Sequence, residues 1–458
     1  MLAIGLRAAS LGSRDKLVTS LVFLYWLVYE NVIFFYAQDY GGTPLFLFTN
    51  GIKLFLPFLL LVLTGLPSSR MFREWPVGVY LVFFVAFLLW GAVPTLVSGD
   101  PLAWFKLLPR FVFFLSLVAF FSKRPSAFLL FAKCVIVYVI SALVQYVLVY
   151  LTGAYDNRLA TANGFMAGPH GLLGNLTSMM WFPGFPIPIL RLCGFWNEPS
   201  HASASAFAAF FLARYVGVIT GSGFWKKTSY AAFLAGILAL SNAGYFALGS
   251  ALLVGALFGG GRLTANRAFR LSFIVPIAGG LLWIVIFGRS YVSANLAGNV
   301  WARAITGVRD LDLQASDPSG GRIDVMHMTV DKAEETFIGV GLQEVGSDGI
   351  TGSGAAPLLW LLLTGFPGLL LILCREATLV HSGVSLLRRA PVTMPLVQAL
   401  TVVMAQHLSY GSWMNPNYFI HAAMVLVCCR RVAREPVPSG ELRNERSVDR
   451  LDEAFSIS

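Results

Sequence analysis

Charged side chains are scarce in this chain of 458 residues. Lys, Arg, Asp and Glu make up 12% of it, whereas hydrophobic residues make up 57%, and the mean hydropathy is +0.71. In an ordinary soluble domain about a quarter of the residues are charged. The composition therefore excludes a water-soluble globular domain and predicts an integral membrane protein.

Cysteines and clusters of metal-ligating residues are also scarce. Of five cysteines only Cys193 falls in a segment expected to face outward, so no disulfide framework is predicted. The segment "RDLDLQASD" offers Asp310, Asp312 and Asp317 as a divalent-cation site. Carboxylates at this spacing are common in solvated loops, however. We therefore expect no metal and no cofactor.

Long apolar runs dominate what is present. A hydrocarbon core about 30 Å thick requires roughly 20 apolar residues per helical crossing. Twelve apolar runs predict an all-α polytopic membrane domain over residues 1–431. The expected spans are 17–37, 45–66, 77–97, 102–121, 128–151, 200–220, 229–241, 243–258, 271–288, 355–374, 392–409 and 417–430.

Basic residues set the expected orientation of these spans. Eighteen Lys and Arg residues, Arg375 among them, fall in segments assigned to the cytoplasm, and none falls in the short outer connections. Both termini are therefore expected inside. The same rule makes 229–258 a hairpin broken at "LSNAG", because a single crossing would place Arg262, Arg267 and Arg270 outside.

Polar chemistry is concentrated in two long segments that then face outward, 152–199 and 289–354. Long loops without a core of their own are usually functional, so we expect the active surface there. The segment 432–458 mixes acidic and basic residues and is predicted to be a disordered cytoplasmic tail. The formal charge of +10 follows from the inside bias, and no nucleic-acid partner is expected.

Three charges lie inside expected spans, about 8 residues from the outer helix end: Glu30, Lys53 and Arg110. Ionisable groups at such depth pair with one another or face a water-filled cavity. We favour a structural pair between Glu30 and Lys53 over a role in substrate binding.

Three motifs carry a family resemblance. The first is "RLCGFWNEPSHASA" at the start of the sixth span. The second is the broken hairpin "LSNAGYFAL". The third is "SGGRIDVMHMTVDKAEETFIGVG" followed by "LLLTGFPGLL". In this order and spacing they resemble the O-antigen ligase and Wzy-type polymerase superfamily of bacterial envelope glycosyltransferases.

The resemblance implies a GT-C-like helical fold in the bacterial inner membrane, with the active site facing the periplasm. The donor would be an oligosaccharide on undecaprenyl pyrophosphate, with a chain-length regulator as a further candidate partner beside the bilayer. We expect a metal-independent polymerase that joins repeat units of O-antigen, capsule or exopolysaccharide.

Two alternatives stay open. A ligase would transfer the glycan to lipid A-core, but ligases usually carry a His shortly before the glycine that matches Gly365, and this chain reads "GSGAAP" there. A transporter of lipid-linked glycans would place charges on broken helices near the membrane midplane, often in repeated halves. The sequence shows no convincing internal repeat.

Transfer from a pyrophosphate requires stabilisation of the leaving charge and removal of a hydroxyl proton. The resemblance makes Arg191 and Arg322 the catalytic candidates for the first task, because a guanidinium binds phosphate oxygens bidentately. The candidate base is Glu198, which precedes Pro199 at the expected start of a helix; capping of that helix would explain it equally well. The substrate-binding candidates are Arg309, Arg289, His201 and His327.

Overall fold

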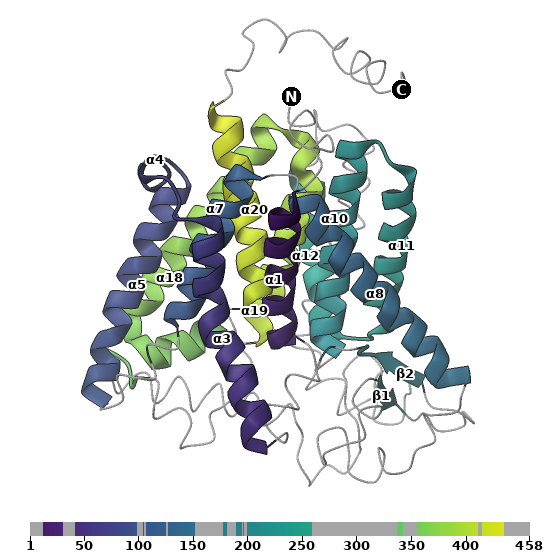
Figure 1. Ribbon diagram of the computed structural model, residues 1–458, viewed down its shortest axis with the longest axis horizontal. Coiled ribbons are helices and arrows are strands. Elements are labelled where there is room, and N and C mark those ends of the chain that lie inside the picture. The colour runs from purple at the N-terminus through teal and green to yellow at the C-terminus, as the bar shows by residue number, and fades with distance from the viewer. Residues whose placement is uncertain are drawn as a thin grey trace, which may run out of the picture.

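The computed structural model describes residues 12–30, 42–98, 104, 107–124, 127–151, 177–180, 189–194, 196, 199–258, 337–341, 356–410 and 415–434. These form a bundle of helices that run side by side, with a small hairpin of strands at one end (Figure 1). The expected ninth span, 271–288, lies outside the described residues, as do nearly all of the outer loop 289–354 and the tail from residue 435.

The helices follow the apolar runs of the sequence. They are α1 (Ser13–Glu30), α3 (Gly42–Thr64), α4 (Ser69–Arg73), α5 (Val77–Ser98), α7 (Leu108–Lys123), α8 (Ala127–Leu151), α10 (Pro199–Thr220), α11 (Gly223–Leu238), α12 (Asn242–Phe258), α18 (Ala356–Arg389), α19 (Met394–Tyr410) and α20 (Pro416–Arg434), with a short 3₁₀ helix at Pro391–Thr393. Within the described ranges, five helices are long and apolar enough to cross a membrane: those containing Leu47–Thr64, Val77–Val97, Ala127–Leu148, Pro199–Thr220 and Leu359–Arg389. The protein is therefore membrane-embedded.

The expected break at "LSNAG" is confirmed. Helix α11 ends at Leu238 and α12 begins at Asn242. Between them Leu240 adopts a positive φ of 46°, which a helix does not allow. The Tyr245 hydroxyl donates to the carbonyl of Ile237 across the break at 2.8 Å. The chain therefore reverses direction between α11 and α12, and both helices pack against α10.

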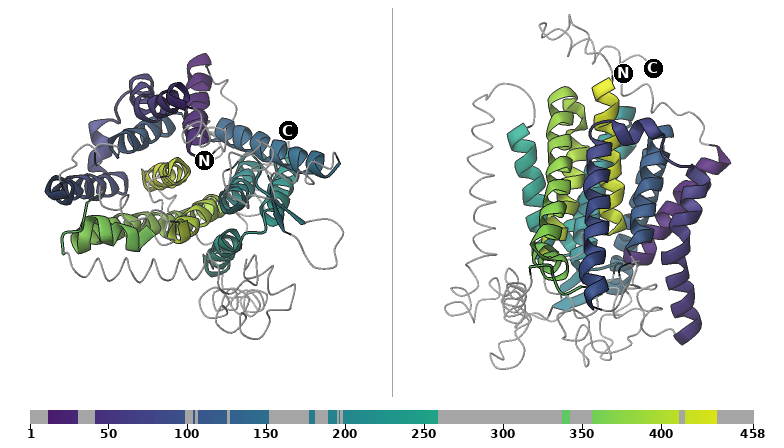
Figure 2. Two further views of the ribbon diagram at one scale, coloured as in Figure 1. Left: turned by 90° about the horizontal axis from the view of Figure 1, so that it is seen from below. Right: turned by 90° about the vertical axis from the view of Figure 1, so that its left-hand side faces the viewer.

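Helix α20 occupies the centre of the bundle. Seen along the helix axes, the other helices surround it (Figure 2), and every residue from Pro416 to Arg430 is buried. A helix enclosed on all sides can carry polar side chains only where neighbouring helices satisfy them. The polar residues of α20 are thus the first place to look for a functional site.

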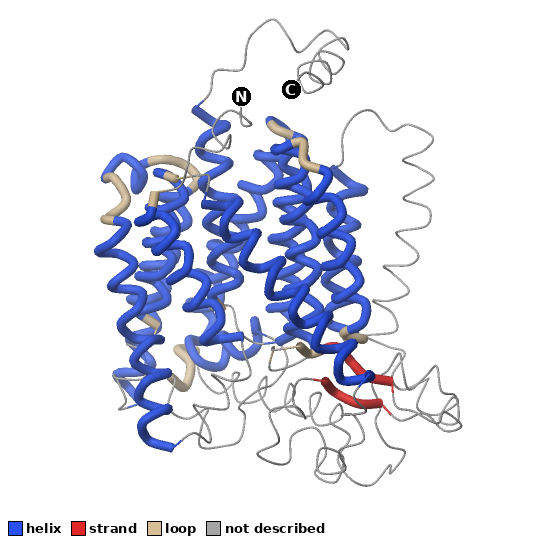
Figure 3. The backbone as a smooth tube through the Cα atoms, turned by 45° about the vertical axis from the view of Figure 1, so that its right-hand side comes forward, coloured by secondary structure: helices blue, strands red, loops and turns tan. Residues whose placement is uncertain are grey.

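The described residues are almost entirely helical, as expected, and the first outer loop adds a short hairpin of strands that the sequence did not predict. Residues Thr177–Met180 (β1) and Ile189–Leu192 (β2) pair as antiparallel strands, with Ser178 opposite Arg191. Figure 3 shows this hairpin in red at one end of the bundle, and α10 begins seven residues after β2 ends. Three of the four residues of "ILRL" are apolar, and the last of them, Leu192, is buried. We call this end, where α1 also terminates, the Glu30 end.

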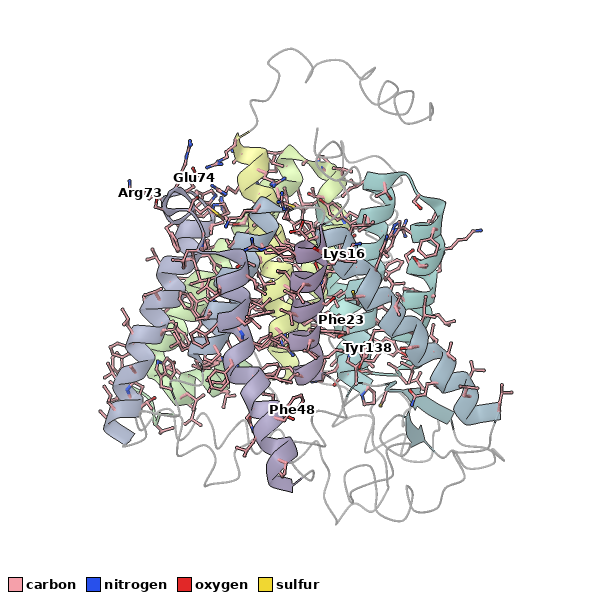
Figure 4. The ribbon with its side chains drawn as sticks, viewed as in Figure 1. Lys16, Phe23, Phe48, Arg73, Glu74 and Tyr138 are labelled. Atoms are coloured by element: carbon pink, nitrogen blue, oxygen red, sulfur yellow. The ribbon has the colours of Figure 1, made fainter. Side chains whose placement is uncertain are left out.

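The opposite end, here called the Glu74 end, carries Arg73 and Glu74 (Figure 4). Glu74 lies just after α4 and is bonded by Arg70 (2.8 Å), Arg430 (2.7 Å) and Arg434. Helix α20 extends through Arg434, so the start of the predicted tail at residue 432 is corrected: residues 432–434 are helical. Several basic residues assigned to the cytoplasm therefore gather around one acidic residue.

Candidate functional site

The Glu30 carboxyl group lies at the meeting point of three helix ends. It is 1% exposed. Its Oε2 is 2.9 Å from Nδ1 of His201, in the first turn of α10, and its Oε1 accepts a hydrogen bond of 2.6 Å from the Asn415 side chain, just before α20. Both carboxyl oxygens are therefore held by groups that come from distant parts of the sequence. We call these three side chains the Glu30 centre.

Asn415 is held in place by the start of α20. The segment "NPN" places Pro416 at the first helical position, where its missing N–H costs nothing. The Asn415 side-chain oxygen accepts the backbone N–H of Asn417 at 2.9 Å, as an N-cap does. The Asn417 side chain donates in turn to Ser205 of α10 at 3.3 Å. One asparagine therefore both caps α20 and orients Glu30.

The chain segment that precedes His201 is also tightly packed. After β2 the chain turns at Gly194, which has a φ of 57°; a Cβ there would lie 2.3 Å from the Cβ of Ala142 in α8. Trp196 follows, fully buried, with its ring centroid 4.6 Å from that of Tyr138. Figure 4 shows Tyr138 along α8, inside the bundle. The backbone leading from Arg191 toward α10 is thus anchored to the helices.

The expected Glu30–Lys53 pair is wrong, because Glu30 pairs with His201 instead. Lys53 lies with its Nζ 5.0 Å from the ring centroid of Tyr29, and the Arg110 guanidinium lies 5.5 Å from the same ring. Consecutive helical residues point about 100° apart, so Tyr29 faces α3 and α7 while Glu30 faces α10 and α20. Arg110 also stands in the first turn of α7, less far into its helix than expected.

Of the expected site residues, only His201 has a described side chain. Arg191 lies in β2 at the Glu30 end, but its side chain is outside the described residues. Five others lie wholly outside them: Glu198, Arg289, Arg309, Arg322 and His327. The structure thus brings His201 together with Glu30 and Asn415, two residues that the sequence did not assign to a site.

The described end of the third motif, segment 337–341, folds back on the exit helix. Helix α18 is interrupted at Gly365, which has φ 66° and ψ −173°. Segment 337–341 docks at this interruption: the N–H of Val340 bonds Leu362 O at 2.9 Å, that of Gly341 bonds Leu363 O at 3.1 Å, and that of Phe366 bonds Phe337 O at 3.2 Å. A Cβ on Gly365 would stand 2.1 Å from the Phe337 oxygen, so the contact requires glycine. The "FIGVG" and "LLLTGFPGLL" pieces are therefore one structural unit.

Sequence reasoning missed a second buried polar cluster. Arg375 is fully buried in α18, and its Nε and Nη2 donate to Glu376 Oε1 at 2.9 and 2.7 Å. The Tyr418 hydroxyl donates to the same carboxyl group at 2.7 Å and lies 3.1 Å from the Tyr80 hydroxyl. The Arg375 guanidinium also lies 5.0 Å from the ring centroid of Phe84. We call these five residues the Arg375 centre.

The expected position of Arg375 is corrected by this cluster. The tenth span was expected to end at residue 374, with Arg375 in the cytoplasm, yet α18 continues to Arg389. The charge does not end the helix, because Nε and Nη2 of the guanidinium donate to Glu376 and three aromatic rings lie around it. The adjacent Arg–Glu pair in "LLLILCREATLV" was the signal that could have indicated it.

Two further histidines are buried beside the Glu30 centre. His421 of α20 contacts the Asn417 carbonyl through Nδ1 at 2.8 Å, and the His407 ring of α19 lies 5.8 Å from the Tyr418 ring. His407 is within electrostatic range of both His201 and His421. Across the described ranges, no three His, Cys, Asp or Glu side chains are grouped as metal ligands would be.

No protein-family model matches this chain, and no curated protein matches it.

Proposed function

We propose that this protein is a polymerase of lipid-linked oligosaccharide repeat units, of the O-antigen ligase and Wzy-type polymerase superfamily. The three motifs carry the resemblance. The observation that supports it best is the Glu30 centre: the first motif delivers His201 to a buried carboxyl group at the end of the bundle where β2, with Arg191, also lies. The docking of segment 337–341 on α18 further supports treating the third motif as a unit.

In the proposed reaction the donor glycan leaves undecaprenyl pyrophosphate and joins a sugar hydroxyl of the acceptor at the periplasmic face of the inner membrane. Arg191 and Arg322 stabilise the charge that develops on the pyrophosphate, with Arg309 and Arg289 as further phosphate contacts. His327 binds sugar. A residue near the start of α10 accepts the proton of the attacking hydroxyl. From the sequence alone, Glu198 is the candidate for this general base.

The test uses purified protein in lipid nanodiscs with an undecaprenyl-pyrophosphate-linked repeat unit. We expect a ladder of lengthened glycans and free undecaprenyl pyrophosphate. Arg191→Lys retains the charge but loses the planar fork, so we expect turnover to fall by about tenfold or more. Transfer to lipid A-core with no ladder would instead identify a ligase.

A transporter of lipid-linked glycans is the second candidate, and the Arg375 centre favours it. Transporters place charges within the membrane on interrupted helices, and Arg375 lies ten residues beyond the interruption of α18 at Gly365. Translocation of the lipid-linked unit across proteoliposomes without a new glycosidic bond would support this function over the polymerase.

A further inference from the structure

The contact between Glu30 and His201 joins residues 171 positions apart. The carboxyl group cannot rotate freely, because Asn415 holds Oε1 while His201 takes Oε2. Asn415 is itself fixed as the cap of α20. The orientation of the imidazole is therefore set by three helices rather than by one flexible side chain.

This geometry decides which imidazole nitrogen is basic. With Glu30 ionised, its oxygens only accept hydrogen bonds, so Nδ1 of His201 carries the hydrogen of this contact. In a neutral imidazole the lone pair then resides on Nε2. A carboxylate behind an imidazole holds the tautomer and orientation that a general base requires.

The His201 side chain is more exposed than that of Glu30, and a general base must be exposed enough to reach a substrate hydroxyl. The Glu30 side chain is 1% exposed and that of His201 is 14% exposed. His201 is thus the more exposed member of the pair, and it follows Glu198 by only three positions. We infer that His201 accepts the proton of the attacking hydroxyl and that Glu30 is its positioning residue; this inference rests on the proposed polymerase function.

The step balances as follows. The acceptor hydroxyl oxygen forms a bond to the anomeric carbon of the donor sugar, and its proton moves to Nε2 of His201. The bond between the anomeric carbon and the pyrophosphate oxygen breaks, and that oxygen keeps the electron pair. Undecaprenyl pyrophosphate leaves as an anion, and the imidazolium returns its proton to water.

Glu30→Gln is the decisive variant, because it preserves the shape. The glutamine oxygen can still accept from Asn415, but its NH₂ group donates to Nδ1 of His201 and forces the proton onto Nε2. We expect turnover to fall by about 10²–10⁴-fold in Glu30→Gln and in His201→Gln, with the KM for the lipid-linked donor within about threefold of wild type. Glu30→Asp, which keeps a carboxylate, should retain more turnover than Glu30→Gln.

Glu74→Gln is the matched control, since it makes the same chemical change at the opposite end and should leave turnover unchanged. Thermal unfolding establishes that each variant is folded. ¹⁵N NMR of histidine-labelled protein at pH 8 shows which ring nitrogen carries the hydrogen, and a change in packing alone would not alter this. The protonated nitrogen of His201 should change from Nδ1 in the wild type to Nε2 in Glu30→Gln.

Three outcomes count against the inference. Folded Glu30→Gln and His201→Gln proteins that turn over like the wild type would overturn it and leave the polymerase function standing. Loss of turnover in Glu198→Gln alone would assign the base to Glu198. A wild-type protein that forms no ladder from its repeat unit would overturn the polymerase function and the proton transfer together.

Discussion

Glu30 and Glu376 are both carboxyl groups buried in a membrane-embedded bundle, and their surroundings differ in kind. Glu30 meets an imidazole and an amide at the ends of three helices. Glu376 meets the guanidinium of Arg375 and the Tyr418 hydroxyl within the length of α18 and α20. Both carboxyl groups are held by hydrogen bonds, so burial alone does not separate their roles.

The two carboxyl groups differ in whether their partner side chain can exchange a proton. An imidazole gains and loses a proton near neutral pH, whereas a guanidinium stays charged. Arg375 is also enclosed by the rings of Tyr80, Phe84 and Tyr418, at 5.0 to 5.7 Å from their centroids. The Glu30 centre is therefore suited to chemistry and the Arg375 centre to joining α5, α18 and α20.

The largest effect on stability is expected from Arg375→Met. Removal of the cation leaves Glu376 buried without its charge partner, which costs about 3–5 kcal/mol. Thermal unfolding of the purified protein in detergent measures the loss. The double variant Arg375→Met, Glu376→Gln should recover most of it. If Arg375→Met unfolds at the wild-type temperature, the Arg375 centre does not hold the bundle together.

Glu30→Ala should cost less, about 2–3 kcal/mol, because it strands the two donors of His201 and Asn415 without removing a permanent charge partner. Glu30→Gln, which still satisfies both, should stay within about 1 kcal/mol of wild type. The same unfolding measurement ranks the two variants. Equal losses in both would mean that the negative charge, rather than the hydrogen bonds, stabilises this end.

The sequence predicted the helices well because their signals are local. Apolar runs, Pro199 at a first helical position and the polar break at "LSNAG" lie within a few residues of the boundaries they determine. The strands β1 and β2 were missed because a four-residue strand in a loop leaves only a short alternating pattern.

The buried centres could not be predicted in the same way, because their partners are distant in sequence. Glu30 contacts residues 171 and 385 positions away, and no periodicity links them. Lys53 was the nearer opposite charge and was wrongly chosen. Arg375 was read as a span boundary although Glu376 is its neighbour in sequence, because the Tyr418 hydroxyl that also bonds Glu376 lies 42 positions away on another helix. Of the three residues of the Glu30 centre, His201 alone was named as a site candidate from the sequence, through the motif that contains it.

Tyr418→Phe tests whether the two centres are separable. It removes the hydroxyl that donates to Glu376, and we expect a loss of about 1–2 kcal/mol. Turnover per folded molecule should stay within about threefold of wild type, because the Glu30 centre does not use this hydroxyl. Tyr80→Phe is the matched control, since its hydroxyl contacts Tyr418 but has no bond to Glu376. A large loss of turnover in Tyr418→Phe would show that the Arg375 centre takes part in the reaction.

The smallest effect is expected at Glu74, a carboxylate on the protein surface. Hydrogen bonds from Arg434 and then Arg430 lower the pKa of Glu74 from 4.5 to about 2. Its contribution to stability is thus fully present above pH 4.5, declines below it and is lost as the pH falls through about 2.

Surface ion pairs contribute little and are screened by salt. Glu74→Gln should therefore lower Tm by about 2 °C or less at pH 7 and low salt. The difference from wild type should narrow in 1 M NaCl and below pH 4.5. A difference that persisted under both conditions would mean that Glu74 stabilises this end by packing rather than by charge.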